Sequence, residues 1–162
     1  MAARAAPVLD SHDLTEERRR FIDDFGQMYN HFGLSLSFGR TFALLLTNDG
    51  PLSLNDIAAL LETSKSAISV ATRDLQSTGL ARRSGRPGSR RVLYEANDDL
   101  LPTFEAQFAR VRQSLVVLKR GRGLGLRGKA RERMRDMIAL HEFWLAESQG
   151  IVERWRRRRL TS

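Results

Sequence analysis

The stretch that decides the fold runs from Ser53 to Ala96 and reads SLNDIAALLETSKSAISVATRDLQSTGLARRSGRPGSRRVLYEA. Its centre, Ser64–Gln76, predicts a helix, because apolar side chains recur there at helical spacing and define an inward face: Ala67, Ile68, Ala71 and Leu75. The opposite face carries short or flexible side chains, namely those of Ser66, Ser69, Val70 and Arg73. Lys65 and Gln76 lie at its edge. None of these side chains is acidic, whereas an ordinary surface helix would mix glutamate with lysine there.

That outward face matches the chemistry of base edges and phosphates. Arginine can form two hydrogen bonds with guanine, serine can donate or accept, and valine can contact a thymine methyl group. The sequence therefore predicts a helix that lies in the major groove of DNA. The alternative is that this helix is an ordinary surface helix of a winged-helix fold and contacts another protein.

Turn and cap signals flank this helix. Ser53 and Asp56 match a capping box in which aspartate replaces the usual glutamate, so a short helix is expected to begin at Leu54. Ser64 is a second N-cap candidate, and Gly79 stands where a glycine would end the following helix. Two short helices separated by so tight a turn predict a helix-turn-helix unit.

Two predicted strands follow, Leu80–Arg83 and Arg91–Ala96, around the turn-forming residues SGRPGSR. This hairpin is basic, with no acid before Glu95, and it carries five arginines: Arg82, Arg83, Arg86, Arg90 and Arg91. Contact with phosphates or with the minor groove is expected from at least one of them. A solvated basic hairpin is the alternative.

SKSAISVATRDLQSTGLARRSGRPGSRRVLYEA (64–96) resembles the winged helix-turn-helix of MarR-type bacterial transcriptional regulators, and GLSLSFGRTFALLLTNDGPLSLNDIAALL (33–61) resembles their GbsR-like branch. The resemblance implies a sequence-specific DNA-binding regulator, a homodimeric repressor that reads a palindromic operator. The chain departs from many relatives at Glu62, where they often have glycine, and at Ser89, where their wing has aspartate. Arg86 and Arg90 are our candidates for the wing arginine that reaches the minor groove.

The expected fold is mainly α with a small β-hairpin wing, a winged helix-turn-helix with N- and C-terminal dimerisation helices. We expect a flexible arm at 1–12, an N-terminal dimerisation helix at 13–34, the DNA-binding domain at 35–96, and a C-terminal helical dimerisation region at 97–162 with a Gly-rich break at 121–128. Thr15 predicts the start of the first helix and Gly33 its end. Asn97 or Asp98 is expected to cap the long helix after the wing.

The terminal helices carry more apolar residues than a small winged-helix domain needs for its own core. One stripe runs along the first helix, and a coiled-coil-like seam runs along the helix after the wing. The residues expected at a dimer interface are Phe21, Phe25, Met28, Phe104, Phe108, Val111, Leu115, Trp144 and Ile151. The dimer would present its two recognition helices to half-sites about 34 Å apart.

Composition limits the class of protein. The net charge is +8, and residues 101–162 hold fifteen basic and six acidic side chains, so a polyanion partner is favoured. The chain has no cysteine, and the longest apolar run, Phe42–Leu46, is too short to span a bilayer, so we expect a cytoplasmic, nucleoid-associated protein with no membrane partner. The basic clusters 110–135 and 154–159 are either solvated faces or contacts with DNA.

No enzymatic or cofactor site is expected. His12, His31 and His141 lack the spacing of metal ligands, and no nucleophile motif or phosphate loop is present. A small-molecule effector of unknown identity is an open possibility, because relatives of the resembled family bind effectors between the dimer helices and the winged helix. The aromatic residues that would line such a pocket would otherwise be core: Phe25, Tyr29, Phe32, Phe143 and Trp144. The alternative function is an architectural or RNA-associated basic protein.

Overall fold

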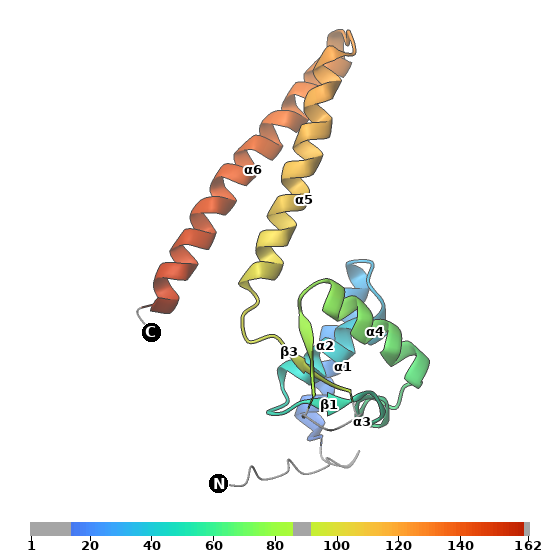
Figure 1. The fold of residues 1–162 in the computed structure, drawn as a ribbon. Coiled ribbons are helices and arrows are strands. Elements are labelled where there is room, and N and C mark those ends of the chain that lie inside the picture. Colours follow the sequence, from blue (N-terminus) through green and yellow to red (C-terminus); the bar gives the residue numbers. More distant parts are fainter. Residues whose placement is uncertain (1–13, 86–91, 161–162) are drawn as a thin grey trace. The chain divides into compact units, whose positions relative to one another are not determined.

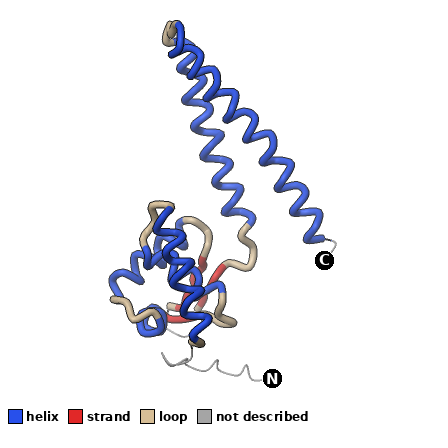
Figure 2. Tube along the Cα trace, turned by 180° about the vertical axis from the view of Figure 1, so that it is seen from behind, coloured by secondary structure: helices blue, strands red, loops and turns tan. Residues whose placement is uncertain are grey.

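The computed structural model describes residues 14–85 and 92–160, and it divides the chain into two compact units, residues 1–100 and 101–162 (Figures 1 and 2). The first unit contains α1 (Glu16–His31), α2 (Leu36–Leu46), β1 (Leu52–Ser53), α3 (Leu54–Leu60), α4 (Lys65–Ser77), β2 (Ala81–Ser84) and β3 (Leu93–Ala96). The second contains α5 (Leu101–Arg120), the 3-10 turn η1 (Gly121–Gly123) and α6 (Gly128–Leu160). The expectation of a mainly α protein with a small wing is confirmed.

The first two helices, α1 and α2, each begin at a residue whose side chain caps the helix. Thr15 Oγ1 accepts a hydrogen bond from the backbone nitrogen of Arg18, and Gly33 ends α1 with a φ of +82°. Ser35 caps α2, accepting from the backbone nitrogen of Phe38 at 3.1 Å. The caps place two helices of defined length directly before the helix-turn-helix.

The core of the first unit is built around α2. Seven of its eleven residues are buried, so α2 is covered on most of its circumference. On one side α1 packs so closely that a Cβ added to Gly39 would lie 2.8 Å from the Cα of Gly26. Beside this crossing, Phe25 and Tyr29 of α1 contact the rings of Phe38 and Phe42.

The aromatic stripe of α1 is therefore divided between two roles. Ile22 is buried, and Phe25 and Tyr29 pack against the core, so burial raises the pKa of the Tyr29 hydroxyl. Phe21 and Phe32 remain exposed, as does Met28. Only this exposed half is left for a contact outside the unit.

A three-stranded antiparallel sheet closes the first unit, in the order β1-β3-β2. Tyr94 of β3 lies opposite both Leu52 of β1 and Arg83 of β2, and its side chain is buried. The two-residue strand β1 was not expected from the sequence, because two residues carry no alternation that could be recognised. It joins the start of α3 to the base of the wing.

The second unit is a helical hairpin in which α5 and α6 lie side by side, joined through η1 (Figures 1 and 2). Leu115, Ile138 and Val152 are buried between the two helices. The Gly-rich break falls within the connection, where Gly125 and Gly128 have positive φ values of 64° and 54°. Among the described residues, no helix is long and apolar enough to cross a membrane.

The predicted start of α5 was wrong. The helix begins at Leu101, because the two candidate caps are engaged elsewhere. The Asn97 side-chain amide donates to the carbonyl oxygen of Gly79, and the Asp98 carboxylate pairs with Arg82. The side chains of Asn97 and Asp98 thus attach the segment after β3 to Gly79 and to β2.

Candidate nucleic-acid interface

The helix-turn-helix opens with the predicted capping box. The backbone nitrogen of Ser53 donates to Asp56 Oδ2 at 3.0 Å, and the backbone nitrogen of Asp56 donates to Ser53 Oγ at 3.2 Å. Aspartate therefore performs the role that glutamate usually has at this position. Ile57, Ala58, Leu60 and Leu61 are buried, so α3 packs into the core of the first unit.

The turn between α3 and α4 contains the one described non-glycine residue with positive φ, Glu62, at 50°. Its backbone nitrogen donates to Ala59, and that of Thr63 donates to Ala58, which is the Schellman pattern for ending a helix. Glycine is the usual residue at this position, because a Cβ costs about 1–2 kcal/mol in the left-handed region. Glu62 adopts this left-handed conformation in place of glycine.

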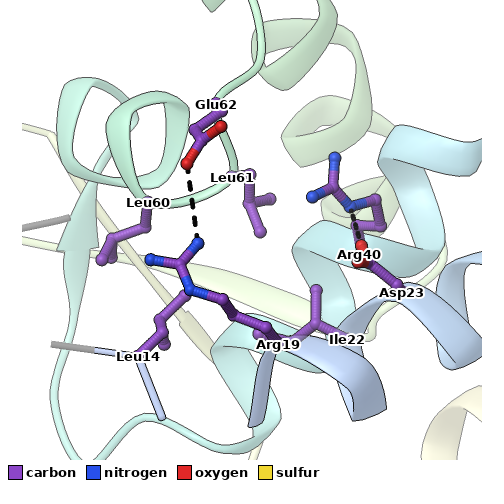
Figure 3. Close-up of a pocket in the computed structure, with 8 residues that line it drawn as sticks. All are labelled: Leu14, Arg19, Ile22, Asp23, Arg40, Leu60, Leu61 and Glu62. Atoms are coloured by element: carbon purple, nitrogen blue, oxygen red, sulfur yellow. Dashed lines mark ion pairs between the residues drawn. The ribbon is translucent and has the colours of Figure 1, made fainter. Parts of the chain in front are cut away.

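Side chains from α1 and α2 contact this turn (Figure 3). Arg19 of α1 pairs with Glu62 at 3.6 Å. Arg40 of α2 lies 2.8 Å from the Asp23 carboxylate, without a well-aligned hydrogen bond from Nε, and its Nη1 donates to Thr63 Oγ1 at 3.4 Å. These side chains surround a hollow of about 160 Å³ above Leu14, Ile22, Leu60 and Leu61. Side chains of α1 and α2 thus hold the turn between α3 and α4 in place.

The helix α4 begins and ends at defined residues. Ser64 Oγ accepts from the backbone nitrogen of Ala67 at 3.3 Å. Gly79, with φ of 75°, ends the helix in a second Schellman pattern that includes a hydrogen bond from Leu80 to Leu75. Ile68, Ala71 and Leu75 have no exposed surface, which fixes the rotation of the helix about its axis.

The opposite face of α4 is directed to solvent. Lys65, Ser66 and Arg73 are exposed, Val70 keeps 50% of its surface, and Ser69 is half-buried. Arg73 forms no ion pair with any described residue, so its guanidinium has its donors available. Asp74 is exposed at the edge of this face and is the one acid within α4. The face can donate hydrogen bonds and offers apolar contact at its centre.

The wing differs from its sequence expectation at Arg82. This residue lies opposite Glu95 in the β2–β3 register, and its guanidinium pairs with Glu95 at 3.0 Å and with Asp98 at 2.8 Å. The hydrogen bond that Arg82 donates to Glu95 and the charges of both acids raise the pKa of Arg82. Its charge is therefore neutralised locally. The strand register could have revealed this pair, because residues opposite one another in antiparallel strands interact.

Arg83 lies on the same strand and forms no ion pair with an acid in the part of the chain that the structure describes. It is exposed, with its guanidinium carbon 6.0 Å from the centroid of the Tyr94 ring. Among the described residues no acid neutralises its charge, in contrast to that of Arg82. Arg86 and Arg90, the two arginines predicted to contact phosphate or the minor groove, lie outside the described residues, as do Arg91 and Ser89.

The residues expected at a dimer interface lie in different environments. Those with substantial exposure are Phe21, Met28, Phe104, Trp144 and Ile151. Phe108 and Val111 are half-buried, and the Phe108 ring contacts Trp144 at a centroid distance of 5.2 Å. Phe25 packs against the core of the first unit, and Leu115 is 8% exposed between α5 and α6. The last two are occupied by packing within the chain.

The aromatic residues considered for an effector pocket are distributed over both units. Phe25 and Tyr29 contact Phe38 and Phe42, so they serve the packing of α1 on α2. In the hairpin, Val111, Leu140, His141 and Trp144 line an open apolar hollow of about 260 Å³. Within residues 14–85 and 92–160, no group of three or more histidine and acidic residues is placed to hold a metal ion.

Comparisons with known proteins point to one family. Residues 32–92 match the model of the MarR family. A putative HTH-type transcriptional regulator, YvaV of Bacillus subtilis (strain 168), is 25% identical over 96 residues, which are 59% of this chain and 54% of that protein. The HTH-type transcriptional repressor OpcR of the same organism is 26% identical over 102 residues, 63% of this chain and 54% of the repressor. The chain spans about half the length of these two relatives.

A solved crystal structure described as that of a transcriptional regulator has a similar fold. Its TM-score is 0.76 and its sequence identity is 21%, over 87% of this chain and 99% of that chain. At this identity the likeness concerns the fold alone. It extends beyond the residues of the family model and includes most of the helical hairpin.

Proposed function

We infer that this chain belongs to the MarR family, whose model residues 32–92 match, and that it regulates transcription by binding duplex DNA as a homodimer. The observation that carries this proposal is the outward face of α4, which is exposed, free of acid at its centre and held in register by a buried opposite face. The relatives named as HTH-type regulators, one of them a repressor, support repression as the mode of action.

In this proposal α4 enters the major groove. Arg73 donates two hydrogen bonds to guanine, Ser66 and Ser69 bond to base edges or phosphate, and Val70 contacts a thymine methyl group. Lys65 at the start of the helix contacts phosphate. Arg86 and Arg90 of the wing contact the backbone or the minor groove, whereas Arg82 is excluded because its charge is paired with two acids.

Dimerisation gives the proposed operator its symmetry. A two-fold axis would place two α4 helices on half-sites about 34 Å apart, so the operator should be an imperfect inverted repeat. The exposed apolar residues of α1, α5 and α6 form the interface in this proposal, with Phe104, Trp144 and Ile151 at its centre. Similarity to the GbsR-like branch belongs to the proposal as well, and a small-molecule effector would act by favouring a spacing that no longer fits the half-sites.

The second candidate function is an architectural or RNA-associated protein that uses the winged helix as a scaffold. Its support is the distribution of charge, because the basic excess lies in residues 101–162 and not in the helix-turn-helix. The two functions differ in specificity. Equal affinity for promoter DNA, random DNA and structured RNA at physiological salt would favour the architectural protein, and a preference for one promoter site would favour the regulator.

Arg73→Ala tests the proposed function. On the preferred site, found by selection or in the DNA upstream of the coding region, it should cost about 1–3 kcal/mol and reduce discrimination between sequences. Arg20→Ala is the matched control, because it removes the same charge from an exposed position on α1. Fluorescence anisotropy with operator and scrambled duplexes gives both affinities. Unchanged operator preference in Arg73→Ala would show that α4 does not read bases.

A wing variant separates phosphate contact from base reading. Arg90→Ala should weaken binding to all sequences by a similar factor and flatten the dependence of log K on log salt concentration by about one. The operator preference should survive. A selective loss on the operator would instead assign a base contact to Arg90.

A further inference from the structure

The connected end of the α5–α6 hairpin carries a dense group of cations that the helix-turn-helix does not use. We call it the basic tip, and it consists of Lys119, Arg120, Arg122, Arg127, Lys129, Arg131, Arg133 and Arg135. Glu132 is the one acid between residues 119 and 135. In Figure 1 this segment lies where α5 ends and α6 begins. So high a density of one charge produces a local field that attracts polyanions.

Most of these charges are not compensated within the protein. Lys119 pairs with Glu142 at 2.7 Å and Arg135 with Asp136 at 3.3 Å. The other six cations are exposed, and they form no ion pair with a described residue. The field is felt at Glu142, where the hydrogen bond from Lys119 lowers the carboxyl pKa and the nearby charge of Arg122 lowers it further.

Helical geometry distributes the cations over the outside of the tip. Ile138 of α6 is buried and Met134 packs against Gly121 of η1, so this side of α6 faces the interior of the hairpin. Lys129 and Arg133, four residues apart, share one outer side, while Arg131 and Arg135 share another. The connection adds Arg122 and Arg127 among glycines without side chains. The tip can therefore contact a surface from more than one side.

The composition of the tip selects among polyanions. Six of its eight cations are arginines, whose planar guanidinium groups bond phosphate with two parallel hydrogen bonds. Residues 109–142 contain no Phe, Tyr or Trp. A surface that binds single-stranded nucleic acid stacks bases on such rings, and a membrane-interface surface is enriched in Trp and Tyr. Phosphates of duplex DNA, which require neither stacking nor insertion, match the tip best.

We propose that the basic tip is a second, sequence-independent binding surface for the phosphates of duplex DNA, distinct from α4 and the wing. Its assignment to DNA rests in part on the proposed function of the first unit. The tip reads no bases, so it adds affinity without specificity. Once α4 holds a duplex, the linked tip contacts DNA at a raised effective concentration, and even a weak phosphate contact then contributes to occupancy.

The test replaces four tip cations in the full chain: Arg127→Gln, Lys129→Gln, Arg131→Gln and Arg133→Gln. Glutamine is a good helix former and these positions are exposed, so the fold should be retained, as circular dichroism would check. The control removes four charges near the C-terminal end of α6: Arg154→Gln, Arg157→Gln, Arg158→Gln and Arg159→Gln. Binding of a random duplex of about 30 bp is followed by anisotropy over a series of salt concentrations.

The tip variant should flatten the slope of log K against log salt by about two to four and weaken binding at least about tenfold near 0.15 M salt. The control should change the slope by less than about one, and the ratio of operator to random affinity should be unchanged in both variants. A tip variant that behaves like the control would show that the cations are only solvated, and would overturn the proposal.

Two further outcomes separate this proposal from the proposed function. If the wild-type chain lacks operator preference but loses random-duplex affinity with the tip variant, the tip stands and the regulator fails. If Arg73→Ala abolishes operator preference while the tip variant matches its control, only the tip fails. Flotation with vesicles containing about one quarter phosphatidylglycerol is the last arm. Tip-dependent flotation without tip-dependent DNA binding would overturn the proposal in favour of a lipid surface.

Discussion

The winged helix-turn-helix has a large cluster of buried apolar side chains within one chain, whereas the α5–α6 hairpin leaves most of its large apolar side chains exposed. In the described part of residues 1–100, sixteen buried apolar residues form one cluster that includes α2, α3 and α4. In α5 and α6 the buried apolar residues are Leu115, Ile138 and Val152. The large apolar residues still exposed there are Phe104, Val116, Val117, Leu124, Met137, Leu140, Phe143, Trp144, Ile151 and Trp155.

Two helices side by side offer one mutual seam, so a second apolar face on either helix has nothing to cover it within the pair. Soluble proteins rarely expose contiguous apolar patches of this kind unless a partner covers them. The comparison therefore leads us to expect that the first unit is stable as a single chain and that the hairpin depends on a second copy.

The largest effect is expected in the core of the first unit. Ile68→Ala removes a fully buried side chain from the inner face of α4 and should lower the free energy of unfolding by about 2–5 kcal/mol. Val70→Ala, two residues away on the exposed face, should change it by less than about 0.5 kcal/mol. Urea denaturation measures both. Similar losses in the two variants would mean that α4 is rotated from the orientation described.

The dependence of the hairpin on a second copy is tested next. Ile151→Asp places a charge on the exposed apolar side of α6 and should raise the dimer dissociation constant at least about thirtyfold, or about 2 kcal/mol, if this residue lies at the centre of the interface. Gln149→Asp adds a charge to the same helix without removing an apolar side chain and should have a much smaller effect. Sedimentation equilibrium measures both constants, and a wild-type chain that stays monomeric at high concentration would contradict the dimer.

A smaller effect is expected in the turn that holds α4. Glu62→Gly relieves the left-handed strain, whereas Glu62→Ala retains it, and both lose the Arg19 pair, whose acid is 77% exposed. The glycine variant should therefore be more stable than the alanine variant by about 1 kcal/mol, while the lost pair itself matters little. Thermal unfolding of both variants isolates the backbone contribution. Equal midpoints would show that this turn carries no strain.

The smallest effect concerns the hairpin near its tip. Lys119 lowers the pKa of Glu142 below its ordinary value of 4.5, so the pair stabilises the folded chain above that pH, and the contribution is lost as the pH falls through the lower folded pKa. Glu142→Gln should weaken this acid dependence slightly, because both side chains are nearly half exposed. Glu147→Gln on the same helix is the control. Identical pH profiles of the melting temperature in all three proteins would mean that the pair has no net effect.

Local signals in the sequence were sufficient for most of the first unit. Thr15, Ser35, Ser53 and Ser64 each cap a helix by accepting a hydrogen bond from the backbone nitrogen three residues later, an interaction between near neighbours. The rotation of α4 also followed from periodicity, since Ile68, Ala71 and Leu75 lie on one side of any regular helix. Neither inference needed knowledge of distant parts of the chain.

The features that sequence reasoning missed depend on residues far apart in the chain. The composition of the wing does not show that Arg82 is paired, because the strand register and the fold bring Glu95 and Asp98 beside it. The position of Asn97 predicts a helix cap, but its side chain bonds to the carbonyl oxygen of Gly79 after the end of α4. A residue has one side chain and several possible partners, and the sequence does not rank partners that only folding brings close.

By itself, then, the amino-acid sequence determined the capped helices of the first unit, the basic composition of the wing and the outward face of α4, because each depends on the chemistry of neighbouring residues. Tertiary structure decided which charges remain free, which half of the α1 aromatic stripe is buried, and that Leu115 packs inside the hairpin while Ile151 does not. These outcomes depend on which surfaces meet, and periodicity can identify an apolar face but not the element that covers it.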